Sequence, residues 1–123
     1  MVPMTWGSAM ASLEENDAEV DAAAFNALRD ALGPIDLAAL IEECVMDIDA
    51  ACASLEGARS DLERRPHAHK IAGLLAQYAC LKAAGLALRI AHEESVDAAS
   101  LSPILTSRAR TCARELQSLA KAR

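Results

Sequence analysis

Three histidines, His67, His69 and His92, are the side chains in this sequence best suited to chemistry near neutral pH. A neutral imidazole can act as a nucleophile, exchange protons or bind a metal ion. His67 and His69 stand two positions apart in the stretch PHAHKIAGLLAQYAC, whose pattern is typical of a helix. Two such positions are separated by about 200° of rotation, so both rings cannot easily hold one ion. We therefore predict no metal site.

Helical geometry around His69 separates a side of long apolar residues from a side of small ones. At about 100° of rotation per residue, the long apolar side chains gather opposite His69, which predicts a core behind the histidine. These side chains are Ile71, Leu74, Leu75 and Tyr78. The compact residues beside His69 are Pro66, Ala72, Gly73, Ala76 and Cys80, with Arg65 one turn earlier. We predict that His69 is exposed on a collar of small residues.

Small residues on an exposed helix face have two explanations. A solvated face usually carries Lys, Glu, Gln and Arg, and a glycine inside a helix costs about 0.5–1 kcal/mol relative to alanine. Ala72 and Gly73 therefore indicate a surface that approaches the helix closely. That surface belongs either to a partner protein or to another helix of the same domain, and the sequence leaves both open.

The other two histidines have simpler interpretations. His67 should point toward the core side near a helix start, where a structural role is expected. His92 lies near a predicted helix C-terminus, where a positive charge complements the helix dipole.

Charge and hydropathy exclude several classes of partner. The chain carries 12 basic and 18 acidic side chains, for a net charge of −6, so the phosphates of a nucleic acid would be repelled. No apolar run approaches the roughly 20 residues of a membrane helix. The N-terminal MVPMTWGSAMAS lacks the basic start and apolar core of a signal peptide. We predict a cytoplasmic protein with no nucleic-acid partner and no membrane association.

Cysteine spacing gives no sign of a metal ribbon or a redox motif. The four cysteines are Cys44, Cys52, Cys80 and Cys112, and no two of them form a CxxC pair. Disulfides are rare in the cytosol, so we expect none. Cys44, Cys52 and Cys112 fall on apolar helix stripes and should act as small hydrophobic residues, whereas the role of Cys80 stays open.

An all-α fold follows from composition and patterning. The 123 residues are enough for one domain with a real core. Aromatic residues are scarce, and no segment alternates apolar with polar residues, so strands find no support. We expect residues 1–18 to form a poorly ordered or loosely docked N-terminal segment. Residues 19–123 should form the helical domain.

Recognisable signals divide this domain into helices. The first helix should run from about Asp21 to Leu32 and end at Gly33-Pro34. The second should begin after Asp36 as N-cap and end at Gly57.

The later boundaries are less sharply marked. The third helix begins either at the capping box of residues 60–63 or near Pro66. It continues to about Glu94, with a break between Ala79 and Gly85 left open. The final helix should begin with Ser102 as N-cap and Pro103 at its first position. Short connections favour an antiparallel up-down four-helix bundle with one additional N-terminal helix.

The segment AHKIAG, residues 68–73, resembles the A-H-x-L-K-G motif of histidine-containing phosphotransfer (HPt) domains. The flanking AALIEECVMDIDAACASLEGARSDLERR and LLAQYACLKAAGLALRIAHE also resemble that family, so the likeness covers about residues 20–120. Three positions depart from the family pattern. Ala72 stands in place of the usual lysine, Leu74 in place of a small residue, and Ala79 where a second glycine often occurs.

This resemblance implies that His69 is the catalytic nucleophile of a phosphocarrier with no ATP-dependent kinase activity of its own. His69 would accept a phosphoryl group from an aspartyl phosphate on a response-regulator receiver domain, including one that belongs to a hybrid histidine kinase. It would then pass the group to another receiver in a two-component phosphorelay. No cofactor is expected on this chain, because Mg²⁺ would belong to the receiver.

The resemblance also suggests roles for the residues around His69. With Ala72 in the lysine's place, Arg65 and Lys70 are the candidates to position phosphate. We expect a partner-docking face formed by Pro66, Ala72, Gly73, Ala76 and Gln77. The protein is expected to be a monomer. The alternative is a catalytically inactive helical module that binds a receiver or a kinase without phosphotransfer.

Overall fold

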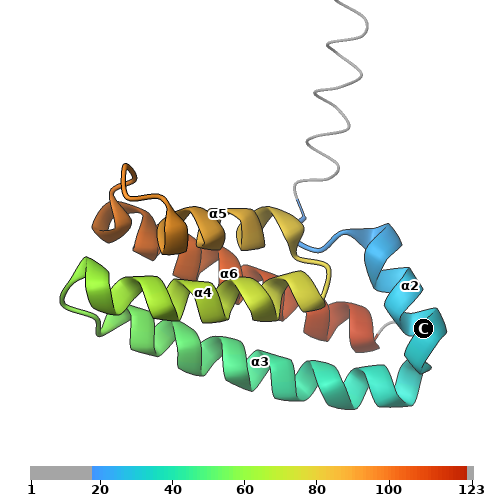
Figure 1. Ribbon diagram of the computed structural model, residues 1–123. Helices are drawn as coiled ribbons and strands as arrows, with labels where there is room; N and C mark the ends of the chain where they lie inside the picture. The colour runs from blue at the N-terminus through green and yellow to red at the C-terminus, as the bar shows by residue number, and fades with distance from the viewer. Residues whose placement is uncertain (1–17, 122–123) are drawn as a thin grey trace, which may run out of the picture.

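The computed structural model describes residues 18–121, which contain five helices and no strand (Figure 1). They are α2 (Ala22–Leu32), α3 (Pro34–Glu56), α4 (Asp61–Gln77), α5 (Leu81–His92) and α6 (Ala98–Lys121). The prediction of an all-α fold is confirmed. Residues 1–17 of the predicted N-terminal segment lie outside the described residues. No helix within residues 18–121 combines the length and the hydrophobicity that crossing a bilayer requires.

The four longer helices lie side by side, and α2 packs across one end. In Figure 1 the chain reverses direction at each connection from α3 to α6. α4 packs against α3, α5 and α6, and α6 also contacts α3 and α5, whereas α2 contacts α3. Helix α4 is therefore covered on several sides, and its exposed residues lie along the remaining outward arc.

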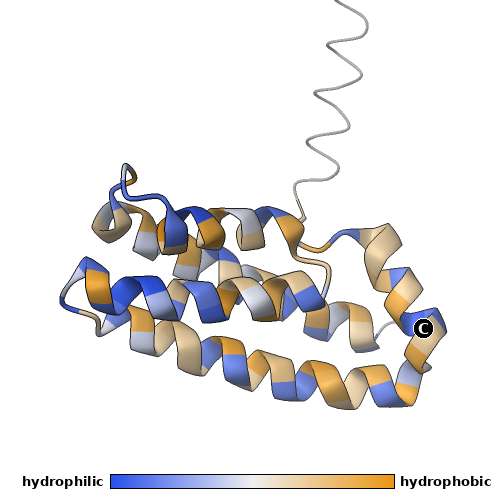
Figure 2. Ribbon diagram, viewed as in Figure 1, coloured by the Kyte–Doolittle hydropathy of each residue, from blue (hydrophilic) through white to orange (hydrophobic). Residues whose placement is uncertain are grey.

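Each helix contributes apolar side chains to a shared core. Figure 2 shows hydrophobic and hydrophilic residues interleaved along the helices, as expected for amphipathic segments. The largest fully buried side chains are Phe25, Leu37, Ile41, Ile48, Leu55, Ile71, Leu75, Ile90, Leu105 and Leu116. Burying one such side chain stabilises the fold by about 1.5–3 kcal/mol.

One glycine separates α2 from α3. The side chain of Asp21 accepts a hydrogen bond from the Ala24 N–H and caps α2, and Gly33 ends this helix with a φ of +84°. The predicted N-cap of the second helix, Asp36, is wrong because α3 already begins at Pro34. Glycine adopts the left-handed conformation that the sharp turn requires, and the fixed φ of proline suits the first helical position. Asp36 lies in the first turn instead.

The capping box decides where α4 begins. Ser60 Oγ accepts the Glu63 N–H at 3.2 Å, so α4 begins at Asp61 and Pro66 lies inside it. The break that the sequence left open separates α4 from α5, with Ala79 at a φ of +70°. A left-handed conformation costs a residue with a side chain roughly 1–2 kcal/mol. The resulting sharp turn brings α5 back along α4.

The predicted start of the last helix, at Ser102 and Pro103, is also wrong. Helix α6 begins at Ala98, after Asp97, whose carboxylate accepts the backbone N–H of Ser100 at 3.2 Å and its hydroxyl at 2.7 Å. Ser102 lies inside the helix, where its hydroxyl donates to the Ala98 carbonyl at 2.6 Å. Asp97 provides the earlier cap, and the helix continues through Pro103.

Cys80 and Cys112 form a disulfide, so the predictions of no disulfide and of Cys112 as a free hydrophobic residue are wrong. Cys80 precedes α5 and Cys112 lies on α6, with their Cα atoms 6.5 Å apart and both residues fully buried. The turn after α4 creates this proximity, which the sequence does not reveal because the two cysteines are 32 positions apart. Cys44 and Cys52 are free and buried, as predicted for small hydrophobic residues.

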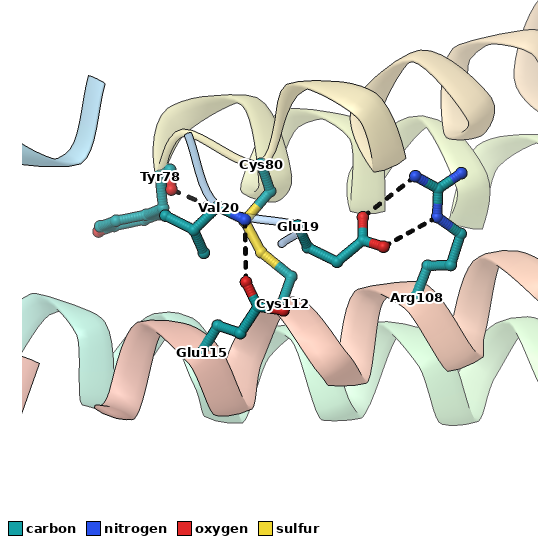
Figure 3. The surroundings of a disulfide bond; sticks show 7 residues. All are labelled: Glu19, Val20, Tyr78, Cys80, Arg108, Cys112 and Glu115. Carbon is teal, nitrogen blue, oxygen red and sulfur yellow. Dashed lines mark hydrogen bonds and ion pairs between the residues drawn. A yellow bond between two sulfur atoms is a disulfide. The ribbon is translucent and has the colours of Figure 1, made fainter. Parts of the chain in front are cut away.

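Residues 19–21 form a short strap beside this disulfide. Figure 3 shows Glu19 facing Arg108, and their ion pair measures 3.1 Å. The backbone N–H of Val20 donates to Glu115 at 3.1 Å, and that of Asp21 donates to the Ala79 carbonyl at 2.8 Å. The strap therefore binds both α6 and the turn between α4 and α5.

Candidate functional site

His69 is exposed on the outward arc of α4, as its helical position predicts. The residues behind it belong to the core, because Ile71, Leu75 and Tyr78 are all buried. The backbone that carries the imidazole is therefore held by packing, while the ring itself is open to solvent. A small molecule or a partner side chain can reach it.

The ring of His69 contacts the ring of His92, the last residue of α5. His69 Nδ1 lies 3.1 Å from His92 Nε2, and the two rings meet edge to face with their centroids 5.1 Å apart. This contact was not predicted from the sequence, which placed His92 only near a helix end. The sequence feature that could have predicted this contact is the break between the two helices. A sharp turn after Gln77 places the C-terminal end of α5 beside the middle of α4.

An open pocket of about 460 Å³ lies next to this pair. It is lined by Leu62, Arg65, Pro66, His69, Ala91 and His92. A guanidinium and two imidazoles on one pocket wall can donate several hydrogen bonds to an oxyanion. The pocket therefore has the donors that a phosphoryl group or a carboxylate requires.

Arg65 is the cation of this pocket. Its side chain is 29% exposed, and its ion pair with Glu94 is long, at 4.0 Å. Its Nε atom is buried and has no hydrogen-bond partner among the described residues. Arg65 is therefore weakly engaged within the domain and available to an anion beside His69. Lys70, the other predicted phosphate-positioning residue, is exposed and does not line the pocket.

The predicted docking face is only partly exposed. Pro66, Gly73, Ala76 and Gln77 are exposed, whereas Ala72 is 3% exposed and belongs to the core. The prediction for Ala72 is wrong because α4 packs against three other helices, and the side that carries Ala72 is buried among them. A Cβ atom added to Gly73 would meet nothing within 4 Å, so packing inside the domain does not explain this glycine. Packing within the domain therefore explains the small size of Ala72 and does not explain Gly73.

Helix α5 extends this surface beyond α4. Among its exposed residues, Leu81, Gly85, Leu88 and His92 recur at helical spacing on one side, and the exposed residues Lys82 and Arg89 flank them. Because His92 touches His69, this side of α5 continues the outward arc of α4. We call the combined surface the α4–α5 face, which consists of Leu62, Pro66, His69, Gly73, Ala76, Leu81, Gly85, Leu88 and His92.

The α4–α5 face combines exposed leucines with glycines and lies beside exposed charged residues. Leu62, Leu81 and Leu88 are exposed although they are large hydrophobic residues. A Cβ atom at Gly85, like one at Gly73, would meet nothing within 4 Å.

Comparison with family models, curated proteins and solved structures finds no match for this chain.

Support for a functional site therefore comes from the geometry of its residues alone. Within residues 18–121, no group of three or more His, Cys, Asp or Glu side chains converges to hold a metal ion. His67, the other member of the HxH pair, is half-buried and does not line the pocket. The groups that meet are one exposed imidazole, a second imidazole in contact with it, and one weakly paired guanidinium.

Proposed function

We propose that this chain is a histidine phosphotransfer protein that carries a phosphoryl group on His69 between receiver domains of a two-component phosphorelay. One observation carries the proposal: an exposed imidazole shares an open pocket with Arg65, at the edge of a two-helix face that carries exposed leucines and glycines. The resemblance of residues 68–73 to the HPt motif supports it. The proposed architecture is an antiparallel up-down bundle of α3 to α6 with α2 as the additional helix.

The proposed reaction is a reversible in-line transfer. A lone pair on the His69 ring attacks phosphorus, the bond from phosphorus to the aspartyl oxygen breaks, and the aspartate leaves as a carboxylate with that electron pair. Most charge compensation comes from Mg²⁺ and the acidic pocket of the receiver. On this chain Arg65 contacts a phosphoryl oxygen, as an arginine beside an oxyanion commonly does.

The proposed partner docks on the α4–α5 face. A receiver must bring its phosphorylated aspartate within bonding reach of His69, so neighbouring side chains have to stay short. Gly73, Ala76 and Gly85 satisfy that requirement, and Leu81 and Leu88 provide apolar contact area. The proposed carrier acts as a monomer and does not use ATP.

The proposed cytoplasmic location has one opposing observation. Disulfides are rare in reducing compartments, and Cys80 and Cys112 are joined by one. The site itself does not depend on this bond, because neither cysteine lines the pocket. The location therefore stays a prediction, separate from the proposed chemistry.

Radiolabelled phosphotransfer from a panel of phosphorylated receiver domains tests the proposal. We expect label on the wild-type chain that is stable in alkali and lost in acid, and none on His69→Gln. His67→Gln is the matched control, since it removes a neighbouring imidazole from outside the pocket, and it should accept label normally. Label that persists in His69→Gln, or no transfer from any receiver, would contradict the assignment.

A second candidate function is docking without chemistry. The observation that favours it is Ala72, which stands where HPt domains usually carry lysine and is buried in the core. A module of this kind would bind a receiver or a kinase through the α4–α5 face and accept no phosphoryl group. Binding that is unchanged in His69→Gln, together with no acid-labile label on the wild type, would favour this alternative.

A further inference from the structure

We infer that His92 is a positioning residue, which accepts a hydrogen bond from His69 Nδ1 and thereby leaves a free lone pair on His69 Nε2. The inference rests on the proposed function and adds a second residue to its chemistry. It starts from the 3.1 Å contact between His69 Nδ1 and His92 Nε2.

A contact between two ring nitrogens requires one proton between them. A neutral imidazole carries a single N–H, on either Nδ1 or Nε2. In the first arrangement His69 Nδ1 carries the proton and donates it to His92 Nε2. In the second arrangement His92 Nε2 donates to His69 Nδ1, and the proton of His69 lies on its own Nε2.

Only the first arrangement leaves His69 a usable nucleophile. In the second, the lone pair on Nδ1 accepts the hydrogen bond and Nε2 carries a proton, so neither nitrogen of His69 can attack phosphorus. In the first, Nδ1 is the donor and Nε2 keeps an unshared pair. A residue that accepts a hydrogen bond from Nδ1 therefore selects the reactive tautomer. Functional histidines are commonly held in one tautomer by a hydrogen bond to their other ring nitrogen.

His92 also favours the product of the transfer. When Nε2 of His69 bonds to phosphorus and the aspartate leaves with the P–O electron pair, the ring becomes a cation that still carries its Nδ1 proton. The hydrogen bond from Nδ1 to His92 Nε2 is then charge-assisted, and such bonds are roughly twice as strong as neutral ones. No additional proton has to enter or leave during the step.

The surroundings allow His92 to play this role. The edge-to-face contact, with an interplanar angle of 83°, restrains rotation of an otherwise exposed ring. The preceding residue, Ala91, is buried and fixes the end of α5 against the bundle. The charged groups near the pair are Arg65 with Glu94, and Arg89 with Glu93. Glu93 accepts from Arg89 at 3.0 Å, whereas Glu94 is 90% exposed and lies 4.0 Å from Arg65. The hydrogen-bond partner that the structure gives to His69 Nδ1 is the ring of His92.

The tautomer can be measured without any phosphotransfer. We propose long-range ¹H–¹⁵N correlation spectra of the ¹⁵N-labelled full chain at pH 8, where an ordinary imidazole, with a pKa of about 6.5, is neutral. In the wild type we expect a protonated Nδ1 and an unprotonated Nε2 on His69. His92→Gln should keep this pattern, because the glutamine side-chain oxygen can replace Nε2 as acceptor. His92→Leu should shift His69 to a mixture of tautomers.

A kinetic measurement completes the test. His92→Leu should slow phosphoryl acceptance by roughly tenfold, because the free ring still spends part of its time in the reactive tautomer, whereas His92→Gln should stay within about threefold of wild type. His67→Leu is the matched control and should leave the His69 tautomer unchanged. Thermal unfolding should confirm that all three variants fold.

The outcomes separate this inference from the proposed function. An Nε2-protonated His69 in the wild type, or an unchanged tautomer in His92→Leu, would overturn the role of His92. Normal transfer by His92→Leu would overturn it as well and leave the proposed function standing. The expected tautomers without label on any chain would support His92 as the acceptor and count against phosphotransfer.

Discussion

Arg110 on α6 holds the carboxylate of Glu56, the last residue of α3, through two hydrogen bonds of 2.7 and 2.9 Å. These bonds lower the pKa of Glu56 below its ordinary value of 4.5. The folded state therefore favours the charged carboxylate. Its contribution to stability is present above the unfolded pKa and is lost as pH falls through the lower folded pKa.

Glu56→Gln should therefore destabilise the protein in a pH-dependent way. Both side chains are partly exposed, so we expect a loss of about 0.2–1 kcal/mol in the free energy of unfolding at pH 7. The difference from wild type should disappear at a strongly acidic pH below the folded pKa, where the carboxylate is protonated in both the folded and the unfolded state. Urea unfolding at the two pH values measures this, with Glu42→Gln as an exposed control on the same helix. An equal loss at both pH values would show that the ion pair is not its cause.

Loss of the disulfide between Cys80 and Cys112 should destabilise the domain strongly. A disulfide between cysteines 32 positions apart stabilises by about 3–4 kcal/mol in the chain-entropy model. A reductant should therefore lower the unfolding temperature of the wild type and leave that of a Cys80→Ala/Cys112→Ala double variant unchanged.

The number of free cysteine thiols tests directly whether the disulfide is present. Burial raises the pKa of Cys44 to about 12 and that of Cys52 to about 11, so neither should be alkylated in the folded protein at pH 8. Alkylation in denaturant should label two cysteines of the oxidised chain and four of the reduced chain. Four free thiols in the untreated protein would contradict the disulfide.

A larger side chain at Gly73 on the α4–α5 face should have opposite effects on stability and on the proposed phosphotransfer. Gly73 is exposed with open space around its Cα, so Gly73→Gln should stabilise α4 by about 0.5–1 kcal/mol through helix propensity. The same substitution should slow phosphotransfer by at least roughly tenfold, because it raises the surface beside His69. Ala50→Gln, on an exposed position of α3, is the control for added bulk. Faster or equal transfer by Gly73→Gln would place docking elsewhere.

Arg65→Ala should weaken the proposed phosphoryl contact without abolishing transfer. Losing one partly exposed cationic contact is worth about 1 kcal/mol, which corresponds to a severalfold lower rate or a shorter phosphohistidine lifetime. Lys70→Ala should have a smaller effect, since Lys70 does not line the pocket. Both quantities can be followed by acid-labile label over time. Unchanged values in both variants would assign all charge compensation to the receiver.

Local periodicity was enough to predict most of the fold and the exposure of His69. The positions of Ile71, Leu75 and Tyr78 around one helix predict a buried side, and the structure buries all three. Ala72 escaped the same reasoning because its burial depends on which helices flank α4. A single helix contains no information about its neighbours.

Long-range contacts were the other limit of the sequence. The contact between His69 and His92 and the bond between Cys80 and Cys112 both depend on the turn at Ala79. Ala79 adopts a left-handed conformation that is usually marked by glycine, so the sequence signal for a sharp turn is weak there. If the sequence had located this turn, helical spacing on its two sides would have predicted that His69 on α4 lies beside His92 on α5.

The bond between Cys80 and Cys112 also changes the chain's topology, since it closes a covalent ring that contains α5 and the connection at residues 93–97. Most of that connection is exposed. A protease that cuts there opens the ring without separating the molecule into two pieces. The fragment that carries His69 then stays covalently linked to α6 by the disulfide alone. The nicked protein therefore remains one covalent molecule until the disulfide is reduced.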